Sequence, residues 1–509
     1  MRSFLECTAI FVALSVIAAP AFAQTDPGVR INTGVNAGGP LPNLANTAGA
    51  TEFFDNGQMR FATQEVVSGG NSTNGFGNGL GPRFNLNQCS ACHSQPAPGG
   101  SSPNINAYPY IGVNPQSQVI KDGIVVNNTI PSFVKVNGPV LEARFPLFIT
   151  SSGALNGTDG GVHDLFTVAG RSDAGNCELA QPNFNQAINL GDIIFRIPTP
   201  VFGAGLVENL GEDTLINNHA SQAGNGFGVS GTFNYNGNDG TISRFGWKAQ
   251  NKSGLLFSGE AYNVEMGITN ELFQNERPDP DEEHFYTGLP ANCLNLAQIG
   301  YPEDITNFTA TKGANQFATN ASIPSDIVMF AMFMRFLNQP IPQPQGYQTA
   351  TATVTAASIT RGQQGFSSVG CAVCHTPQLI TDQSQFTGDL SGKPANLYSD
   401  LEIHHMGGLA DNVMQGSATG DQFRSAPLWG IGQRVFFLHD GRAPDLLTAI
   451  MDHCLQAVID PPAGGGGSGS SSASEACMSE EAFENLPATN NNGAAAVTQQ
   501  DVLNFLRSL

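Results

Sequence analysis

The chain has 509 residues, of which only 12% are charged, and its formal net charge at pH 7 is −21. Such an acidic chain argues against nucleic acid and anionic membrane as partners, and it permits a basic redox protein as a partner. Glycine, with 59 residues, is abundant together with Asn, Ser and Thr, so we expect many loops and few long regular elements.

The first residues have the pattern of a secretory signal. Arg2 precedes an apolar run over 9–19, and the small-residue sequence Ala21-Phe22-Ala23 follows. The run is too short to span a bilayer, and no later stretch is long enough. We therefore expect a signal peptide over 1–23, cleavage near Ala23, a periplasmic or secreted protein, and no integral membrane segment.

Polar, Gly/Pro-rich sequence then predicts an extended arm over 24–50, and apolar residues at helical spacing predict a helix over 52–66. Short apolar runs farther on, at 119–120, 124–126 and 145–148, indicate strands inserted into a first domain. Residues 214–243 are rich in Gly and Asn, so we expect mainly loop there.

Two helices are predicted next, over 255–266 and over 326–337, and the second is apolar on most sides and therefore buried. Residues 340–349 form an interdomain linker in this interpretation, and a helix over 361–369 leads into the second domain. The last helix begins at a capping-box-like sequence over 498–501 and is amphipathic.

Two CxxCH motifs dominate the chemistry of the chain. They contain Cys89, Cys92 and His93 in the first copy, and Cys371, Cys374 and His375 in the second. Two thiols at this spacing can each form a thioether to one haem vinyl group, and the following imidazole can then bind the iron. A zinc site would require further closely spaced Cys or His beside each pair, and the sequence has none. We therefore expect two covalently attached haem c groups.

A second repeated string supports an internal duplication. The sequence FRIPTPVFGAG at 195–205 and the sequence FRSAPLWGIG at 423–432 share Phe-Arg and then Pro, an aliphatic residue, an aromatic residue and Gly-x-Gly. Each string lies downstream of a CxxCH motif. The predicted fold is therefore mainly α, with two cytochrome c-like haem domains, 24–339 and 350–509, and with loop- and strand-rich insertions in the first.

Four cysteines remain after the haem cysteines and Cys7 of the leader are set aside. They are Cys177, Cys293, Cys454 and Cys477. An even number in an oxidising compartment indicates two disulfides, with free buried thiols as the alternative. A Cys454–Cys477 bridge would close a Gly/Ser-rich loop and leave Cys177 to pair with Cys293, although the connectivity stays open at this point.

Together with LHDGRA at 438–443 and EMG at 265–267, the two CxxCH motifs resemble the di-haem cytochrome c peroxidase superfamily, which includes the MauG enzymes and the RoxA-type oxygenases. The RFGWKAQ string at 244–250 and the PLWG string at 427–430 are similar to its di-haem oxidoreductase branch, also labelled thiol oxidoreductase. The resemblance covers about 50–509.

The resemblance implies a sixth ligand for the second haem. In the peroxidases this ligand lies 14 residues after the His of the His-(Asp/Ser)-Gly motif, and from His439 that count reaches His453. The second haem is then ligated by His375 and His453, while Met451 is the runner-up and His404 and His405 are rivals. His439 is expected to hydrogen-bond near the site rather than to bind iron.

The resemblance also implies an open first haem. An acidic residue in Glu-Met, which follows a Trp between the haems, lies over the open iron in the peroxidases. Here Glu265 follows Trp247 by 18 residues, so Glu265 is expected in the distal pocket, Trp247 on the path between the haems, and Glu260 as a substitute or assistant of Glu265. The Gln that partners the distal Glu in the peroxidases has no clear match, and their calcium site is not carried over.

Three functions follow as hypotheses. The first is an exported di-haem oxidoreductase with peroxidase-type chemistry at the N-terminal haem, using a small redox protein or another electron donor and peroxide or another small oxidant. The second is an oxygenase or substrate oxidase of the RoxA or MauG kind. The third is an electron-carrier cytochrome, which would require both haems to have two axial ligands.

Overall fold

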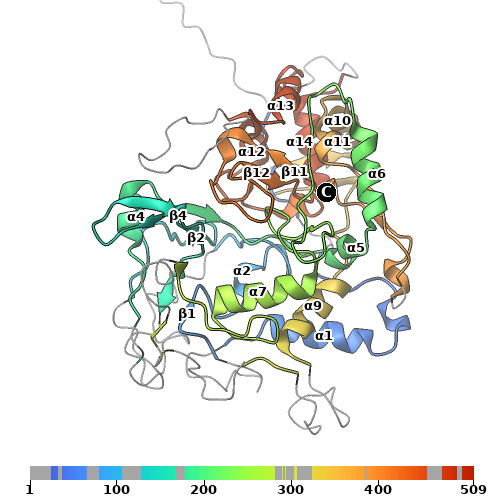
Figure 1. Cartoon of the computed structure of the whole chain (residues 1–509). Helices are drawn as coiled ribbons and strands as arrows, with labels where there is room; N and C mark the ends of the chain where they lie inside the picture. Colours follow the sequence, from blue (N-terminus) through green and yellow to red (C-terminus); the bar gives the residue numbers. More distant parts are fainter. Residues whose placement is uncertain are drawn as a thin grey trace, which may run out of the picture.

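The computed structural model describes residues 24–31, 37–65, 79–105, 128–167, 177, 179–280, 289–290, 293, 303–306, 324–384, 387–455, 473–489 and 496–509. Two groups of helices carry the fold (Figure 1). The N-terminal helix group comprises α1 (Ala50–Phe61), α7 (Gly254–Met266) and α9 (Asp326–Phe336). The C-terminal helix group comprises α10 (Ala356–Ser368), α11 (Cys371–Cys374) and α14 (Gln499–Ser508).

Shorter helices and paired strands surround these groups. The other helices are α2 (Cys89–Cys92), α4 (Phe184–Leu190), α5 (Ala204–Glu208), α6 (Glu212–Gln222), α12 (Leu446–Met451) and α13 (Cys477–Glu484). The antiparallel strand pairs are β1 (Arg83–Phe84) with β5 (Phe166–Thr167), β2 (Glu142–Arg144) with β6 (Ile194–Arg196), β3 (Leu147–Ile149) with β4 (Leu155–Thr158), β7 (Gly346–Gln348) with β8 (Thr353–Thr355), β9 (Leu379–Ile380) with β10 (Pro394–Ala395), and β11 (Ile403–His405) with β12 (Gln422–Arg424).

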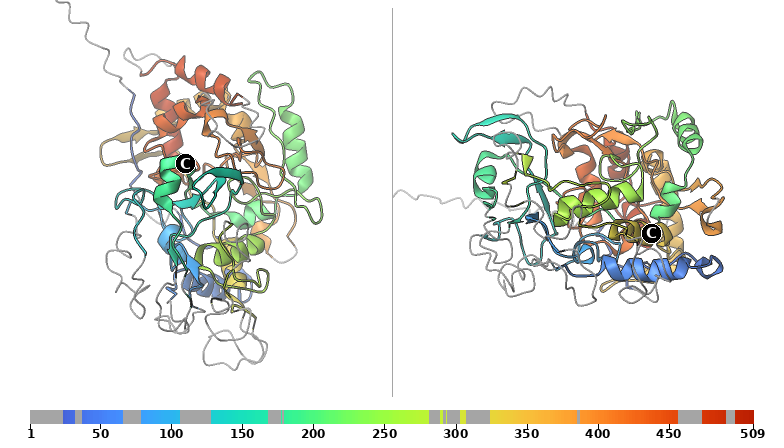
Figure 2. Two further views of the ribbon diagram at one scale, coloured as in Figure 1. Left: turned by 60° about the vertical axis from the view of Figure 1, so that its left-hand side comes forward. Right: turned by 60° about the horizontal axis from the view of Figure 1, so that its bottom comes forward.

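The two helix groups lie at opposite ends of the molecule in Figure 1, with the N-terminal group at the lower end, and the left-hand view of Figure 2 shows the same separation. Each has its own apolar core: one includes Phe54, Phe333 and Tyr262, and the other includes Phe366 and Phe505. The helix α6 runs beside the C-terminal group although it precedes α7 in the chain, and Asn218 Nδ2 donates a hydrogen bond to the hydroxyl of Thr376 at 3.2 Å.

Each helix group is built on a close crossing at a glycine. A Cβ on Gly57 of α1 would lie 2.5 Å from the Met329 carbonyl oxygen of α9, and a Cβ on Gly362 of α10 would overlap the Asp501 carbonyl oxygen of α14. Only a residue without a side chain permits such an approach of two backbones. The helix α14 is also fixed at its start by a capping box between Thr498 and Asp501.

Most of the predicted helices are present. The helix predicted over 52–66 is α1, which ends earlier, and those predicted over 255–266, 326–337 and 361–369 are α7, α9 and α10. The predicted capping box starts α14, and 145–148 contributes to β3. The strands predicted at 119–126 lie outside the described residues.

Two expectations need correction. The segment 214–243 is not mainly loop at its start, because α6 occupies Glu212–Gln222 and is anchored by the fully buried Leu215. The segment 340–349 contains strand β7 of a hairpin, and its role as an interdomain linker stays a prediction. The described residues are also a mixture of helices and small two-stranded sheets rather than mainly α.

Both disulfides form with the pairing that the cysteine count favoured. Cys177 is bonded to Cys293, and Cys454 is bonded to Cys477 at the start of α13. The second bridge ties the residue after His453 to the segment that carries Glu475. Among the helices that the structure describes, none is long and apolar enough to cross a membrane.

Candidate haem cavities

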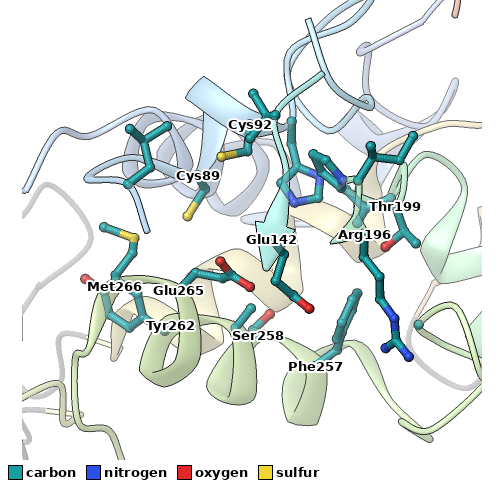
Figure 3. Close-up of a pocket in the computed structure, with 18 of the residues that line it drawn as sticks. Cys89, Cys92, Glu142, Arg196, Thr199, Phe257, Ser258, Tyr262, Glu265 and Met266 are labelled. Carbon is teal, nitrogen blue, oxygen red and sulfur yellow. The ribbon is translucent and has the colours of Figure 1, made fainter. Parts of the chain in front are cut away.

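The first CxxCH motif opens one cavity at the N-terminal helix group, which we call the first cavity. Cys89 and Cys92 lie on the single turn of α2, and both line the cavity (Figure 3). His93 lines it as well, and its Nδ1 is 3.1 Å from the Gly100 carbonyl oxygen. Since a carbonyl only accepts hydrogen bonds, Nδ1 carries the proton and Nε2 keeps its lone pair for a metal.

Electrostatics agree with a neutral ligand at this position. Burial lowers the pKa of His93 to about 4, against the raising effect of backbone contacts with Gly100 and Thr199. An imidazole must be neutral to bind iron. The walls of the cavity are largely apolar, and its lining includes Phe61, Leu86, Val140, Phe330 and Met334.

Glu265 enters the same cavity from the C-terminal end of α7 (Figure 3). Asn85 fixes it twice: the Asn85 backbone N–H donates to the Glu265 carbonyl at 2.8 Å, and the Asn85 side-chain amide donates to the Glu265 carboxyl at 2.8 Å. The segment before Asn85 and the end of α7 approach each other closely here, because a Cβ on Gly81 would overlap the carbonyl oxygen of Gly267. Gly267 ends α7 with φ of 67°, a backbone conformation that favours glycine.

A second carboxyl, that of Glu142, enters from β2. In this strand Ala143 points into the core, while Glu142 and Arg144 point to the cavity. Glu142 lies directly opposite Arg196 of β6 and forms an ion pair with Arg144. Burial raises the pKa of Glu142, but the charges of Arg144 and Arg196 outweigh burial and hold that pKa below its usual value.

The second CxxCH motif opens a separate cavity at the C-terminal helix group, which we call the second cavity. Cys371, Cys374, His375 and His453 all line it. His375 Nδ1 donates to the Tyr398 carbonyl at 2.9 Å, and His453 Nδ1 donates to the Ala449 carbonyl at 2.6 Å. Burial lowers the pKa of His375 to about 4, helped by His453, and burial also lowers the pKa of His453. The two imidazoles therefore both face the cavity as neutral groups with a free Nε2.

The rival ligands of the second haem have other surroundings. Met451 and His405 are not among the described residues that line the second cavity. His404 lines it, but its Nε2 is 3.1 Å from Asp400 and its Nδ1 is 3.1 Å from Glu475. His439 also lines it and stacks on Phe423 with ring centroids 4.2 Å apart.

Trp247 lies between the two cavities and lines both. Its indole N–H donates to the Ile197 carbonyl at 2.8 Å, and its own carbonyl accepts from the Arg424 backbone N–H at 2.8 Å. Its role on a path between two haems stays a prediction. Glu260 has a different place: its carboxyl accepts from Asn251, and it is not among the described residues lining either cavity.

The second cavity contains two cations that suit a haem. Arg424 and Arg434 are both buried in its lining, and their side chains donate to the carbonyls of Gly246 and Pro427. Within the described residues neither forms an ion pair, and burial lowers the pKa of each to about 10. An unpaired buried cation is costly. The anionic propionates of a haem would supply the missing charges, so the residues present fit this group.

Several of these residues are not found by sequence reasoning. Glu142, Arg144 and Asn85 lie in segments without a motif. Arg424 could have been found from the sequence, because it is the Arg of the repeated Phe-Arg string. The Arg at the same place in the other string, Arg196, lines the first cavity. The two strings also share a local backbone form, since β6 and β12 both end at this Arg.

A family model described as "Di-haem oxidoreductase, putative peroxidase" matches residues 159–461, which is more than half of the chain. No curated protein matches the chain. One solved structure, a hydrazine synthase of Kuenenia stuttgartiensis pressurised with xenon, aligns at 18% identity with a TM-score of 0.20, over 38% of this chain and 58% of that one. A score this low carries no argument about fold or function.

Proposed function

This chain belongs to the di-haem oxidoreductase family, and on that premise we propose that it is an exported peroxidase-type enzyme. In this proposal Cys89 and Cys92 hold the catalytic haem in the first cavity, and Cys371 and Cys374 hold an electron-transfer haem in the second. A small redox protein or another donor supplies electrons, and peroxide is the oxidant.

The observation that carries the proposal is the difference between the two cavities. The second cavity presents two neutral imidazoles, those of His375 and His453, which can occupy both axial positions of one iron. The first cavity has His93 as its sole histidine among the described lining residues, and it presents carboxyls instead of a second imidazole. One haem is thereby suited to carry electrons and the other to bind a small oxidant.

When bound, the haem of the first cavity supplies an iron at which peroxide can be reduced. The protein supplies the proton. Burial, together with the charge of Glu142, raises the pKa of Glu265 well above its usual value, which favours the protonated form of this carboxyl. A protonated carboxyl can donate its proton to an oxygen that leaves as water. Trp247, buried between the cavities, offers a conjugated side chain on the electron path.

The test is peroxide turnover by the haem-loaded protein with a reduced donor. The wild-type protein should consume peroxide and oxidise two equivalents of a one-electron donor per peroxide. Glu265→Gln should lower the rate about 10²-fold or more, which is the scale of losing a general acid. Haem content and circular dichroism of the variant provide the control for folding. Unchanged turnover in this variant contradicts the role of Glu265.

A further inference from the structure

Two carboxyl groups meet in the first cavity, and the proposed function uses only one of them. Glu142 from β2 and Glu265 from α7 both enter this cavity (Figure 3), and a hydrogen bond joins their side chains. Two buried carboxyls that share a hydrogen bond do not both ionise readily, because the second negative charge would lie beside the first in a medium of low polarity. A single proton shared between them resolves the conflict.

The surroundings of the pair decide which member is charged. On the side of Glu142, Arg144 forms an ion pair with it and Arg196 lies opposite it in the strand pair. On the side of Glu265, Asn85 donates a neutral hydrogen bond, and Asp164 adds negative charge. No described cation forms an ion pair with Glu265. Glu142 is thus the carboxylate, and Glu265 is the carboxylic acid that donates to it.

Arg196 and Arg144 are themselves held in place. Arg196 donates two hydrogen bonds to Asp411, at 3.1 and 2.6 Å, and Arg144 donates to the Gly160 carbonyl at 3.0 Å. Glu260 contributes a further negative charge near Arg144, but its own carboxyl is turned to Asn251. The charge asymmetry of the pair is therefore built into the strands and does not depend on mobile side chains.

We propose that Glu142 is a second catalytic residue of the first cavity, acting as the proton acceptor while Glu265 acts as the proton donor. This inference rests on the proposed peroxidase function. It differs from the arrangement implied by the resemblance, in which one acidic residue must first accept a proton and then return it. Here the two tasks are divided between two groups that are ready at the same time.

The proton balance is closed. Glu142 accepts the proton of one peroxide oxygen, and Glu265 gives its proton to the other oxygen, which leaves as water when the O–O bond breaks. The remaining oxygen becomes the second water with two protons from solvent and two electrons from the donor, so that H₂O₂, two protons and two electrons give two waters. The proton now on Glu142 returns to Glu265 across their hydrogen bond, and the pair regains its starting state.

An infrared titration of the haem-loaded protein tests the pair without using activity. Burial also raises the pKa values of Asp304, Asp164 and Asp192, so the signal of Glu265 is taken as the difference between wild type and Glu265→Gln. This difference should contain the C=O band of a protonated carboxyl at neutral pH. In Glu142→Gln the band should remain but titrate at lower pH, because the neighbouring negative charge that raises the Glu265 pKa is gone. Glu52→Gln, on the exposed first turn of α1, is the matched control and should leave the band unchanged. A band with the same titration midpoint in Glu142→Gln and wild type overturns the inference.

Peroxide kinetics separate this inference from the proposed function. Glu142→Gln should lower turnover on the order of 10²-fold, and the double variant with Glu265→Gln should lose little more, because both act in one step. Glu142→Asp keeps the negative charge beside Arg144, but its shorter side chain moves the carboxylate away from the peroxide. This variant should therefore fold normally and still turn over peroxide slowly. Wild-type turnover that persists in both Glu142 variants refutes the role of Glu142 and leaves the function standing. A wild-type protein without turnover refutes both.

Discussion

The ligand set of the second haem is decided at the scale of single residues. Counting from His439 pointed to His453, and Met451 was close enough in sequence to compete. The two side chains differ in surroundings, because His453 lines the second cavity with its Nδ1 held by Ala449, whereas Met451 is not among the described lining residues. Counting alone cannot separate positions two residues apart at the end of a short helix, and the surroundings of the two side chains favour His453 as the proposed ligand.

Exchanging the proposed ligand should change the potential of one haem. His453→Met should raise the midpoint potential of the second haem by on the order of 100 mV, because a thioether favours the ferrous state and axial ligands span about 0.8 V in haem proteins. Met451→Leu should leave the potential unchanged. A redox titration followed by visible absorption measures both. The opposite pattern, a shift only in Met451→Leu, would assign Met451 as the ligand.

At the scale of elements, close contacts between backbones position the site. The α10–α14 crossing at Gly362 supports the wall of the second cavity that carries Val502 and Leu506. The close backbone contact at Gly267, where α7 ends, positions Glu265 in the first cavity in a similar way. Periodicity predicted the helices, since it depends only on local sequence, but it could not predict which glycines are contact points between segments far apart in the chain.

Adding one methyl group at the α10–α14 crossing should be costly. In Gly362→Ala the new Cβ would overlap the Asp501 carbonyl, so the two helices must separate. We expect a loss of about 2 kcal/mol in the free energy of unfolding, within the range for overpacking and larger than the gain in helix propensity. Gly226→Ala, at an exposed glycine with open space around its Cβ position, is the control and should be nearly neutral. Equal stability of the two variants, measured by chemical denaturation, would show that the crossing tolerates a side chain.

At the scale of the whole molecule, the two cavities are joined by buried polar contacts as well as by Trp247. Asp411, from the chain after the second motif, accepts from Arg196 at 2.6 Å and from Lys248 at 3.0 Å, and these three side chains are almost fully buried. Such a network holds the strand that faces the first cavity against the segment that flanks the second. The relative position of the two cavities is therefore set by the protein core.

Sequence reasoning singled out the CxxCH residues, Glu265 and Trp247, which line the two cavities, because each lies in a local string. It did not reach Glu142, which precedes Glu265 by 123 residues and meets it only in the folded chain. It also assigned Glu260 a supporting role, because position on a helix does not reveal that the side chain turns to Asn251. Long-range pairing of this kind depends on tertiary packing, which neither periodicity nor spacing records.

The central claim is that the two haems differ in their free axial positions, and electron paramagnetic resonance of the oxidised, haem-loaded protein tests it most directly. The account predicts one low-spin ferric signal, from the haem between His375 and His453, and one high-spin ferric signal, from the haem on His93, and the high-spin signal should change on addition of peroxide. Two low-spin signals that peroxide leaves unchanged would contradict the account and identify an electron carrier.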